Sequence, residues 1–196
     1  MSSEDRAVQA AKKIDGWFNE PEMGPLYQTA IDAIREFPGL AIVEIGSFKG
    51  RSTVVLGIAV QDFGDPDVRV YAVDPHEGKL TTREVEPTFN AFLTNISLAG
   101  VGSFVIPVRE RAECVRWFNP ISLLFIDGLH TFEAVASDYE HFSSFVAPGG
   151  FVVFHDYDNT DFPGVKKFVN QKIESGELIS NHVPEPEKTL IITKKG

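Results

Sequence analysis

The sequence contains only one cysteine, Cys114, among its 196 residues. A single thiol excludes a disulfide within the chain, and such sparse cysteine usage fits a reducing compartment. Cys114 lies just before the aromatic residues Trp117 and Phe118. We expect it to be a small buried apolar side chain rather than a nucleophile.

Positive charge is also scarce. The chain has 18 Lys and Arg residues against 28 Asp and Glu residues, and its formal net charge at pH 7 is −10. Nucleic-acid binding usually needs a concentrated basic surface, whereas the lysine pairs at 166–167 and 194–195 are isolated. We therefore expect no nucleic-acid partner.

Long apolar runs are missing as well. No segment approaches the ~20 apolar residues that span a bilayer, and residues 2–6 lack the apolar core of a signal peptide. These absences predict a cytoplasmic protein without a membrane partner.

The length and composition predict one domain over residues 1–196. Hydrophobic residues make up 43% and charged residues 23% of the chain, which is ordinary for a soluble protein. A chain of this size buries roughly 70% of its unfolded surface, so it can form a core without disulfides or structural metals. We divide it into an N-terminal helical segment, residues 1–39, and a core, residues 40–196.

Hydrophobic periodicity predicts how strands and helices alternate. We expect strands at 40–45, 69–73, 104–108, 122–126, 151–154, 178–183 and 189–193. We expect helices at 5–19, 25–37, 52–63, 87–99, 112–118, 132–146 and 164–174, and a turn at 148–150. Near-continuous apolar strands that alternate with helices indicate an α/β fold. The sheet should be doubly wound and seven-stranded, mostly parallel with a C-terminal antiparallel hairpin, and covered by helices on both faces.

A glycine-rich turn follows the first expected strand. Its spacing, Glu44-x-Gly46-x-x-x-Gly50, differs from the Gly-x-Gly-x-x-Gly of dinucleotide sites and from the phosphate loop. Glycine lets a ligand lie against bare backbone, and the start of the next helix offers unpaired N–H groups. The turn therefore predicts a ligand-binding loop.

Acidic residues follow several of the expected strands, where open α/β sheets bind their ligands. Asp74 ends the second strand and is placed to accept hydrogen bonds from ribose hydroxyls, or else it is a solvated strand cap. Asp127 and Asp156 follow two strands that we expect to be neighbours. Both carboxylates would then reach one point, where a hard divalent ion would relieve their repulsion. The alternative is that Asp127 binds backbone N–H groups and Asp156 faces water.

Histidines accompany these acids. His130 could accept a proton from a substrate hydroxyl, or it could instead cap the helix that follows. His155 could be a metal ligand, a proton acceptor or a group that supports the ligands. His76, His141 and His182 are expected at the surface, with His76 near the ligand-binding loop.

Three segments together resemble class I S-adenosylmethionine-dependent methyltransferases over about residues 40–193. They are residues 43–53 (VEIGSFKGRST), 70–75 (VYAVDP) and 125–132 (FIDGLHTF). Residues 147–157 (APGGFVVFHDY) are similar to the branch of macrocin-type sugar O-methyltransferases and cephalosporin-hydroxylase-like proteins. The resemblance implies a Rossmann-like fold with S-adenosylmethionine as cofactor.

The resemblance also implies roles for individual residues. The glycine loop would pass close to the methionine part of the cofactor, Asp74 would hold the ribose, and residues 111–113 would approach the adenine. The cofactor-binding residues implied in this way are Glu44, Gly46, Ser47, Gly50, Ser52, Thr53, Asp74, Pro75, His76, Arg111, Ala112, Glu113, Asp127, Gly128 and His130.

The resemblance also bears on a metal ion and on the reaction. The sugar O-methyltransferases carry two consecutive acids for Mg²⁺ after the fifth strand, whereas this chain has His155 followed by Asp156. We take Asp127, His155 and Asp156 as ligands for an optional Mg²⁺ or other divalent ion. The working hypothesis is O-methylation of a small hydroxylated molecule, with His130, His155 and Asp127 as catalytic residues.

The sequence leaves three alternatives open. They are a nicotinamide-dependent oxidoreductase, a non-catalytic nucleotide- or S-adenosylmethionine-binding module, and a related fold that has moved to other metal chemistry. The N-terminal segment could form a lid, a homodimer surface or a helix packed on the sheet edge. The acceptor would meet residues 76–86 and 157–162.

Overall fold

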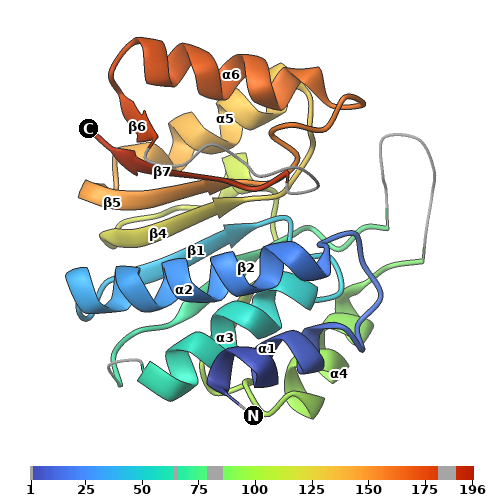
Figure 1. Cartoon of the computed structure of the whole chain (residues 1–196). Coiled ribbons are helices and arrows are strands. Elements are labelled where there is room, and N and C mark those ends of the chain that lie inside the picture. The colour runs from blue at the N-terminus through green and yellow to red at the C-terminus, as the bar shows by residue number, and fades with distance from the viewer. Residues whose placement is uncertain (1, 64–65, 79–85, 181–188) are drawn as a thin grey trace.

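The computed structural model of the chain describes residues 2–63, 66–78, 86–180 and 189–196 (Figure 1). Seven strands form one sheet in the order β3-β2-β1-β4-β5-β7-β6. The pairs among β1 to β5 are parallel, whereas β7 runs antiparallel to both β5 and β6. The predicted mostly parallel sheet with a C-terminal antiparallel hairpin is confirmed.

The strands are short and largely apolar. They are β1 (Ala41–Ile45), β2 (Val70–Val73), β3 (Val105–Val108), β4 (Ile121–Ile126), β5 (Val146–Phe154), β6 (Leu178–Ser180) and β7 (Ile191–Lys195). Every residue of β1 and β4 is buried. Burial of both faces explains why these strands lack the polar alternation of a half-exposed sheet.

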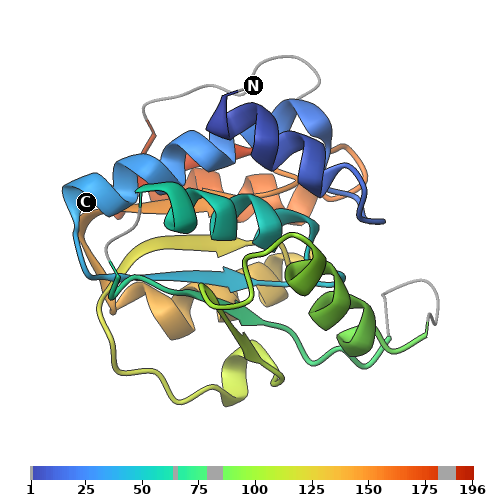
Figure 2. The ribbon, with the colours of Figure 1, turned by 90° about the horizontal axis from the view of Figure 1, so that it is seen from below.

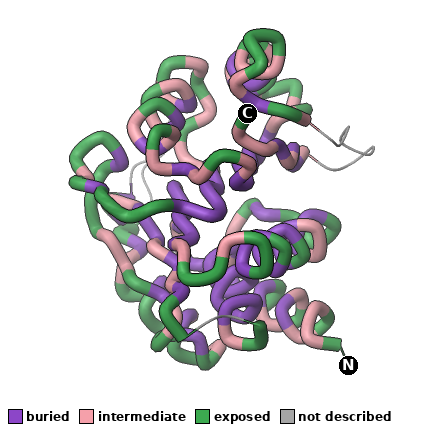
Figure 3. Tube along the Cα trace, turned by 90° about the vertical axis from the view of Figure 1, so that its left-hand side faces the viewer, coloured by how far each residue is buried: buried purple, intermediate pink, exposed green. Residues whose placement is uncertain are grey.

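Helices cover both faces of the sheet, as expected. They are α1 (Ser3–Ala11), α2 (Glu20–Glu36), α3 (Arg51–Phe63), α4 (Phe89–Leu98), the 3-10 helix η1 (Ala112–Cys114), α5 (Phe132–Ser143) and α6 (Pro163–Glu174). Residues of α1 to α4 share one buried cluster with the sheet, and those of α5 and α6 share a second cluster on the opposite face (Figures 1 and 2). Figure 3 shows the buried residues along the strands and the inner sides of the helices. Among the described residues, no helix is long and apolar enough to cross a membrane.

Strand register brings the functional loops to one edge of the sheet. Ile45 at the end of β1 pairs with Val73 of β2 on one side and with Ile126 of β4 on the other. Ile126 in turn pairs with Phe154 of β5. The residues that follow these four strands therefore start from the same level.

The N-terminal segment differs from the expected helices. The first helix ends at Ala11 rather than near residue 19, and the second begins at Glu20 rather than at Pro25. The start of α2 is set by Glu22, whose carboxylate accepts the Asn19 N–H at 3.1 Å. This is half of a capping box, a local signal that outweighs the proline as a marker of the helix start.

The C-terminal half differs in smaller ways. The turn expected at 148–150 lies inside β5, which begins at Val146 and pairs with β4 through a register shift between Ile121 and Leu123. The helix expected at 112–118 is a single 3-10 turn, and Cys114 in it is exposed rather than buried. Of the expected strand 178–183, β6 covers the first three residues, and the rest, with His182 and the connection at 184–188, lies outside the described residues.

Candidate active site

The glycine loop joins β1 to α3 and needs glycine at two positions. Gly46 has φ +89°, and a Cβ there would lie 2.1 Å from the carbonyl oxygen of Asp127. Gly50 has φ +88°, and a Cβ there would lie 3.1 Å from the ring of Phe92 on α4. Both positions favour glycine because L side chains rarely adopt this backbone region. The first contact also places the loop directly against the end of β4.

Glu44, Ser52 and Thr53 lie beneath this loop. All three side chains are buried, and both hydroxyls donate to the Glu44 carboxylate at 2.5 Å. Burial raises the pKa of Glu44 to about 7, despite the two hydrogen bonds that favour its charged form. The three polar side chains therefore bind one another and hold the start of α3 against β1.

Ser47 differs from these supporting residues. Its side chain is 2% exposed, yet Oγ has no hydrogen-bond partner in the part of the chain that the structure describes. Buried hydroxyls are usually paired. Among the residues of the glycine loop, Ser47 therefore gives the clearest indication of a contact with a ligand.

Asp74 ties the glycine loop to the end of β2. Its carboxylate accepts the N–H of Phe48 at 2.8 Å and the N–H of His76 at 2.6 Å. Pro75 between them is half-buried. A carboxylate has about four acceptor positions, so Asp74 keeps the capacity to bind hydroxyl groups.

His76 is buried, which corrects its expected place at the surface. Its ring is 1% exposed between Phe89 and Phe92, and Nδ1 lies 2.8 Å from Thr88 Oγ1. Burial lowers the pKa of His76, against the opposing charge of Asp74. Its Nε2 has no hydrogen-bond partner among the described residues. His141 is half-buried, with Nε2 2.7 Å from the Val115 carbonyl oxygen.

Residues 111–113 lie further out, after β3. Arg111 pairs with Glu77 at 3.1 Å on the surface, Ala112 is buried, and Glu113 is exposed. Burial, together with the charge of Glu113, raises the pKa of Asp138 on α5 to about 7. A Cβ on Gly128 would lie 2.9 Å from the Asp138 carboxylate. Asp138 was not among the predicted site residues, because nothing in its helical pattern indicates that it faces this loop.

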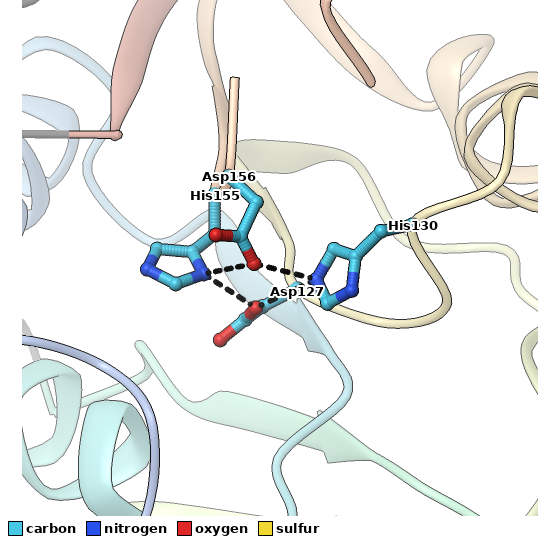
Figure 4. A group of neighbouring side chains, drawn as sticks. All are labelled: Asp127, His130, His155 and Asp156. Carbon is cyan, nitrogen blue, oxygen red and sulfur yellow. Dashed lines mark ion pairs between the residues drawn. The ribbon is translucent and has the colours of Figure 1, made fainter. Parts of the chain in front are cut away.

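Asp127, His130, His155 and Asp156 form the centre of the site, and we call them the His–Asp cluster. One ligand atom from each lies within 4.8 Å of the others. Figure 4 shows the two imidazole rings on either side of the two carboxylates. His155 Nδ1 lies 2.9 Å from Asp127 and 3.1 Å from Asp156, and His130 Nε2 lies 3.0 Å from Asp156 and 3.5 Å from Asp127.

Opposite charges control the protonation of the cluster. Burial by itself would lower the pKa of His155, but the charge of Asp127 and the other nearby carboxylates raise it well above its usual range. Burial would likewise raise the pKa of Asp127, yet the two histidines hold it below its usual value. These opposing charges favour the protonated form of His155 and the ionised form of Asp127.

Asp156 adopts an unusual backbone conformation to reach the cluster. Its φ is +59°, a region that residues other than glycine rarely occupy, and its carboxylate accepts the Asn159 side-chain N–H at 2.7 Å. Such strain collects at functional sites. Phe162 packs on the His130 ring with 4.5 Å between centroids.

Glu22 of α2 is a further site residue that the sequence analysis missed. It is fully buried, and its Oε2 lies 3.0 Å from His155 Nε2. Burial opposes ionisation, but His155 and Thr189 hold the pKa of Glu22 below its usual value. The pattern Asn19-x-x-Glu22 signals a capping box, but no local signal indicates a partner 133 residues away.

The N-terminal segment also crosses the glycine loop. Asp15 pairs with Lys49 at 2.6 Å, the Gly16 carbonyl oxygen accepts from Arg51 at 2.5 Å, and Trp17 packs on Phe48 with 4.9 Å between ring centroids. The structure thus brings three groups to one edge of the sheet. They are the glycine loop with its N-terminal cover, the Asp74–His76 corner and the His–Asp cluster.

Comparisons with known proteins agree with this geometry. A family model described as a methyltransferase domain matches residues 43–157. The uncharacterized protein R132 from Acanthamoeba polyphaga mimivirus is 29% identical over 141 residues, which cover 67% of this chain and 58% of the relative. The chain thus spans less than two thirds of that relative's length.

Solved structures share the fold. The O-methyltransferase NovP has a TM-score of 0.74 at 13% identity, covering 92% of this chain and 83% of NovP. The O-methyltransferase TomG from Streptomyces achromogenes has a TM-score of 0.66 at 17% identity, covering 100% of this chain and 90% of TomG. The Rossmann-like fold and the family predicted from the sequence are confirmed, and the chain belongs to the methyltransferase domain family.

Proposed function

We propose that the protein transfers a methyl group from S-adenosylmethionine to a hydroxyl group of a small molecule. The observation that carries this proposal is the contact of Gly46 with the backbone of Asp127. It places the proposed cofactor loop beside the His–Asp cluster, whose side chains can orient a hydroxyl and take its proton. TomG, which shares the fold, is described as an O-methyltransferase in complex with the same cofactor.

The residues at the loop fit this cofactor. Ser47 Oγ and His76 Nε2 are buried polar atoms without partners among the described residues, and Asp74 has acceptor capacity to spare. We assign Gly46, Ser47 and Gly50 to the methionine part and Asp74 to the ribose. Glu44, Ser52 and Thr53 support the loop from below.

The remaining cofactor contacts are assigned to the surrounding loops. Pro75, His76 and residues 111–113 would border the adenine, while Asp127, Gly128 and His130 would face the methionine end. Bound S-adenosylmethionine supplies a methyl group that its sulfonium already activates. The protein therefore has to position the acceptor in line and remove its proton.

His130 suits the role of proton acceptor better than His155. The His130 side chain is 22% exposed while its Nε2 is buried in the cluster, so an acceptor hydroxyl would meet the other ring nitrogen, Nδ1. The His155 side chain is 3% exposed, and its two ring nitrogens face Glu22 on one side and the Asp127–Asp156 pair on the other. His155 and Asp127 then act by holding the charge and orientation of the cluster.

The cluster also fits a divalent cation. Its four donor atoms converge, and each side chain has lone pairs that suit a metal. A cation held by Asp127, His155 and Asp156 would lower the pKa of an acceptor hydroxyl. We propose such assistance as part of the function.

The expectations on partners and location stay predictions. The net charge of −10 supports a small-molecule acceptor rather than a nucleic acid. Residues 76–78, 86 and 157–162 are the proposed acceptor contacts, and residues 79–85 of that prediction lie outside the described residues. A single domain over residues 1–196, a homodimer through the N-terminal segment and a cytoplasmic location are proposed on the same footing.

Calorimetric titration with S-adenosylmethionine and S-adenosylhomocysteine tests the cofactor assignment. We expect micromolar binding that Asp74→Ala abolishes, while Asp32→Ala on the exposed side of α2 leaves it unchanged. Binding of NAD without binding of S-adenosylmethionine would favour an oxidoreductase instead.

Methyl transfer to a panel of hydroxylated small molecules then tests the reaction. With an acceptor in hand, we expect His130→Ala to lower kcat by about 10²–10⁴-fold, the usual contribution of a general base. Full turnover by both His130→Ala and His155→Ala would remove the base assignment. Cofactor binding with no transfer to any acceptor would point to a non-catalytic binding module.

A further inference from the structure

Glu22 reaches the His–Asp cluster from a distant part of the chain. It lies in the first turn of α2, in the N-terminal segment, and is 0% exposed. Its Oε1 accepts both the backbone N–H and the hydroxyl of Thr189 at 2.8 Å, and its Oε2 accepts the Asn19 N–H at 3.1 Å. Three donors other than His155 thus fix the Glu22 carboxylate.

A helix cap alone does not explain this arrangement. A capping box needs only the contact between Glu22 and the backbone of Asn19. Burial of a carboxylate against a histidine at the end of β5 adds a desolvation penalty that a surface cap avoids. The second contact, from Oε2 to His155 Nε2 at 3.0 Å, therefore indicates a role in the site.

That contact orients the imidazole of His155. A carboxylate accepts a hydrogen bond, so Nε2 carries the proton that faces Glu22. The opposite nitrogen, Nδ1, is then directed at Asp127 and Asp156 (Figure 4). A carboxylate that holds the outer nitrogen of a histidine is the usual support of a metal-bound imidazole.

In the His–Asp cluster, the ligand atoms converge on one point instead of forming aligned hydrogen bonds with one another. His155 is 3% exposed, and its Nδ1 lies close to two carboxylate oxygens, yet neither oxygen meets the directional requirement of a hydrogen bond. The Nε2 of His130 is in the same position between the same two residues. A buried nitrogen without an aligned partner, aimed between two carboxylates, indicates a binding site for a ligand.

We propose that the His–Asp cluster binds a first-row transition-metal dication in preference to Mg²⁺, with Glu22 as the positioning residue that turns His155 Nδ1 toward the ion. Two of the four donors are imidazole nitrogens, which suit transition metals, whereas Mg²⁺ prefers an all-oxygen set. Three carboxylates, from Glu22, Asp127 and Asp156, supply the negative charge that a dication balances. This inference rests on the proposed function only for the role that the ion plays in the reaction. Metal binding itself is measurable without cofactor or acceptor.

Metal binding to the chelator-treated full-length protein provides the test. Free Mn²⁺ is followed by electron paramagnetic resonance, and Mg²⁺ is added as competitor. We expect wild type to bind one Mn²⁺ with ¹⁴N couplings from imidazole in the pulsed spectrum. We expect Glu22→Gln to weaken Mn²⁺ binding about 10–100-fold, as is typical when the partner of a metal-bound histidine is lost. The matched control is Glu20→Gln, an exposed acid in the same helical turn, which should bind Mn²⁺ like wild type.

A second variant keeps the inference testable if Glu22→Gln does not fold. His155→Asp replaces one nitrogen donor by an oxygen donor. It should lower the ratio of Mn²⁺ to Mg²⁺ affinity at least about tenfold. It should also reduce the ¹⁴N couplings. An unchanged ratio would overturn the proposed selectivity.

The remaining outcomes separate this inference from the proposed function. Absence of Mn²⁺ binding to wild type, or wild-type affinity in a folded Glu22→Gln, would overturn the inference, whereas methyl transfer by metal-free protein would leave the proposed reaction standing. Tight Mn²⁺ binding without binding of S-adenosylmethionine would sustain the inference and remove the proposed methyl transfer.

Discussion

At the scale of single residues, the site depends on positions where an ordinary side chain is not tolerated. Gly46 combines a positive φ with direct contact to the Asp127 backbone. Glu44 is an acid buried beneath the same loop, where two hydroxyls hold it. Substitution of either residue has an expected effect on stability, which can be measured without knowing the acceptor.

Gly46→Ala should destabilise the fold and separate the loop from β4. The backbone conformation alone costs about 1–3 kcal/mol, and the clash with the Asp127 carbonyl adds to it. Gly39→Ala is the matched control, since Gly39 also has a positive φ of +78° but a Cβ added there would meet nothing within 4 Å. Urea unfolding should show a clearly larger loss for Gly46→Ala, and equal losses would contradict the close contact.

Glu44 should make stability depend on pH. Its folded pKa of about 7 is raised by burial above the ordinary value of 4.5, so the folded state holds a proton that the unfolded chain releases. The stability that this proton contributes is complete below about pH 4.5 and is lost as pH rises through about 7. Glu44→Gln cannot ionise at this position. The free energy of unfolding of the variant, relative to that of wild type, should therefore rise by about 1–3 kcal/mol between pH 5 and 8.5.

Chemical denaturation across this pH range measures the difference. A gap between wild type and Glu44→Gln that stays constant with pH would show that Glu44 is ionised at all these values. Glu36→Gln, which changes an exposed acid on α2, corrects for the change in net charge.

At the scale of elements, helix starts and strand ends hold the cluster together. The start of α2 brings in Glu22, the residues before β7 bind it through Thr189, and β5 ends at Phe154, directly before His155. His130 stands immediately before α5, whose N-cap Thr131 accepts the Ala134 N–H through its hydroxyl at 3.2 Å. The N-cap of α5 therefore fixes the end of the loop that carries His130.

Removal of this cap should weaken α5. Thr131→Ala is expected to lower the free energy of unfolding by about 0.5–2 kcal/mol, because one N–H of the first turn loses its acceptor. Thr131→Ser keeps the hydroxyl and should stay within about 0.5 kcal/mol of wild type. A Ser variant as unstable as the Ala variant would show that the threonine methyl group, and not the cap, matters.

At the scale of the whole molecule, the order of the strands creates the site. The chain builds β1, β2 and β3 toward one edge of the sheet and then returns to place β4 and β5 on the other side of β1. The change of direction lies between β1 and β4, where open α/β sheets bind ligands. The glycine loop and Asp127 flank this point, and the N-terminal segment crosses it.

A ligand bound there should stabilise the entire fold. At a free concentration of one hundred times its Kd, S-adenosylhomocysteine should add about 2.7 kcal/mol to the free energy of unfolding. For a domain of this size that corresponds to a rise in Tm of about 5–10 °C. Thermal scans of wild type and Asp74→Ala check this, and an equal rise in both proteins would contradict the role of Asp74.

The local pattern of residues was sufficient for much of the fold. Apolar runs located the seven strands, and the glycine spacing located the loop, because burial on both faces and the turn between strand and helix leave a mark on adjacent residues. The same patterns put Asp74, Asp127 and Asp156 at strand ends. The element boundaries in the N-terminal segment were missed because the capping box at Asn19 was overlooked.

The amino-acid sequence by itself thus determined the sheet, the glycine loop and the family of the protein, since each rests on residues that are close together in the chain. Tertiary structure decided that His76 is buried, that Cys114 is exposed and that Glu22 holds His155. These outcomes depend on which distant surfaces pack together. Glu22 and His155 are 133 residues apart, and only the packing of α2 on the sheet brings an N-terminal acid to the histidine at the end of β5.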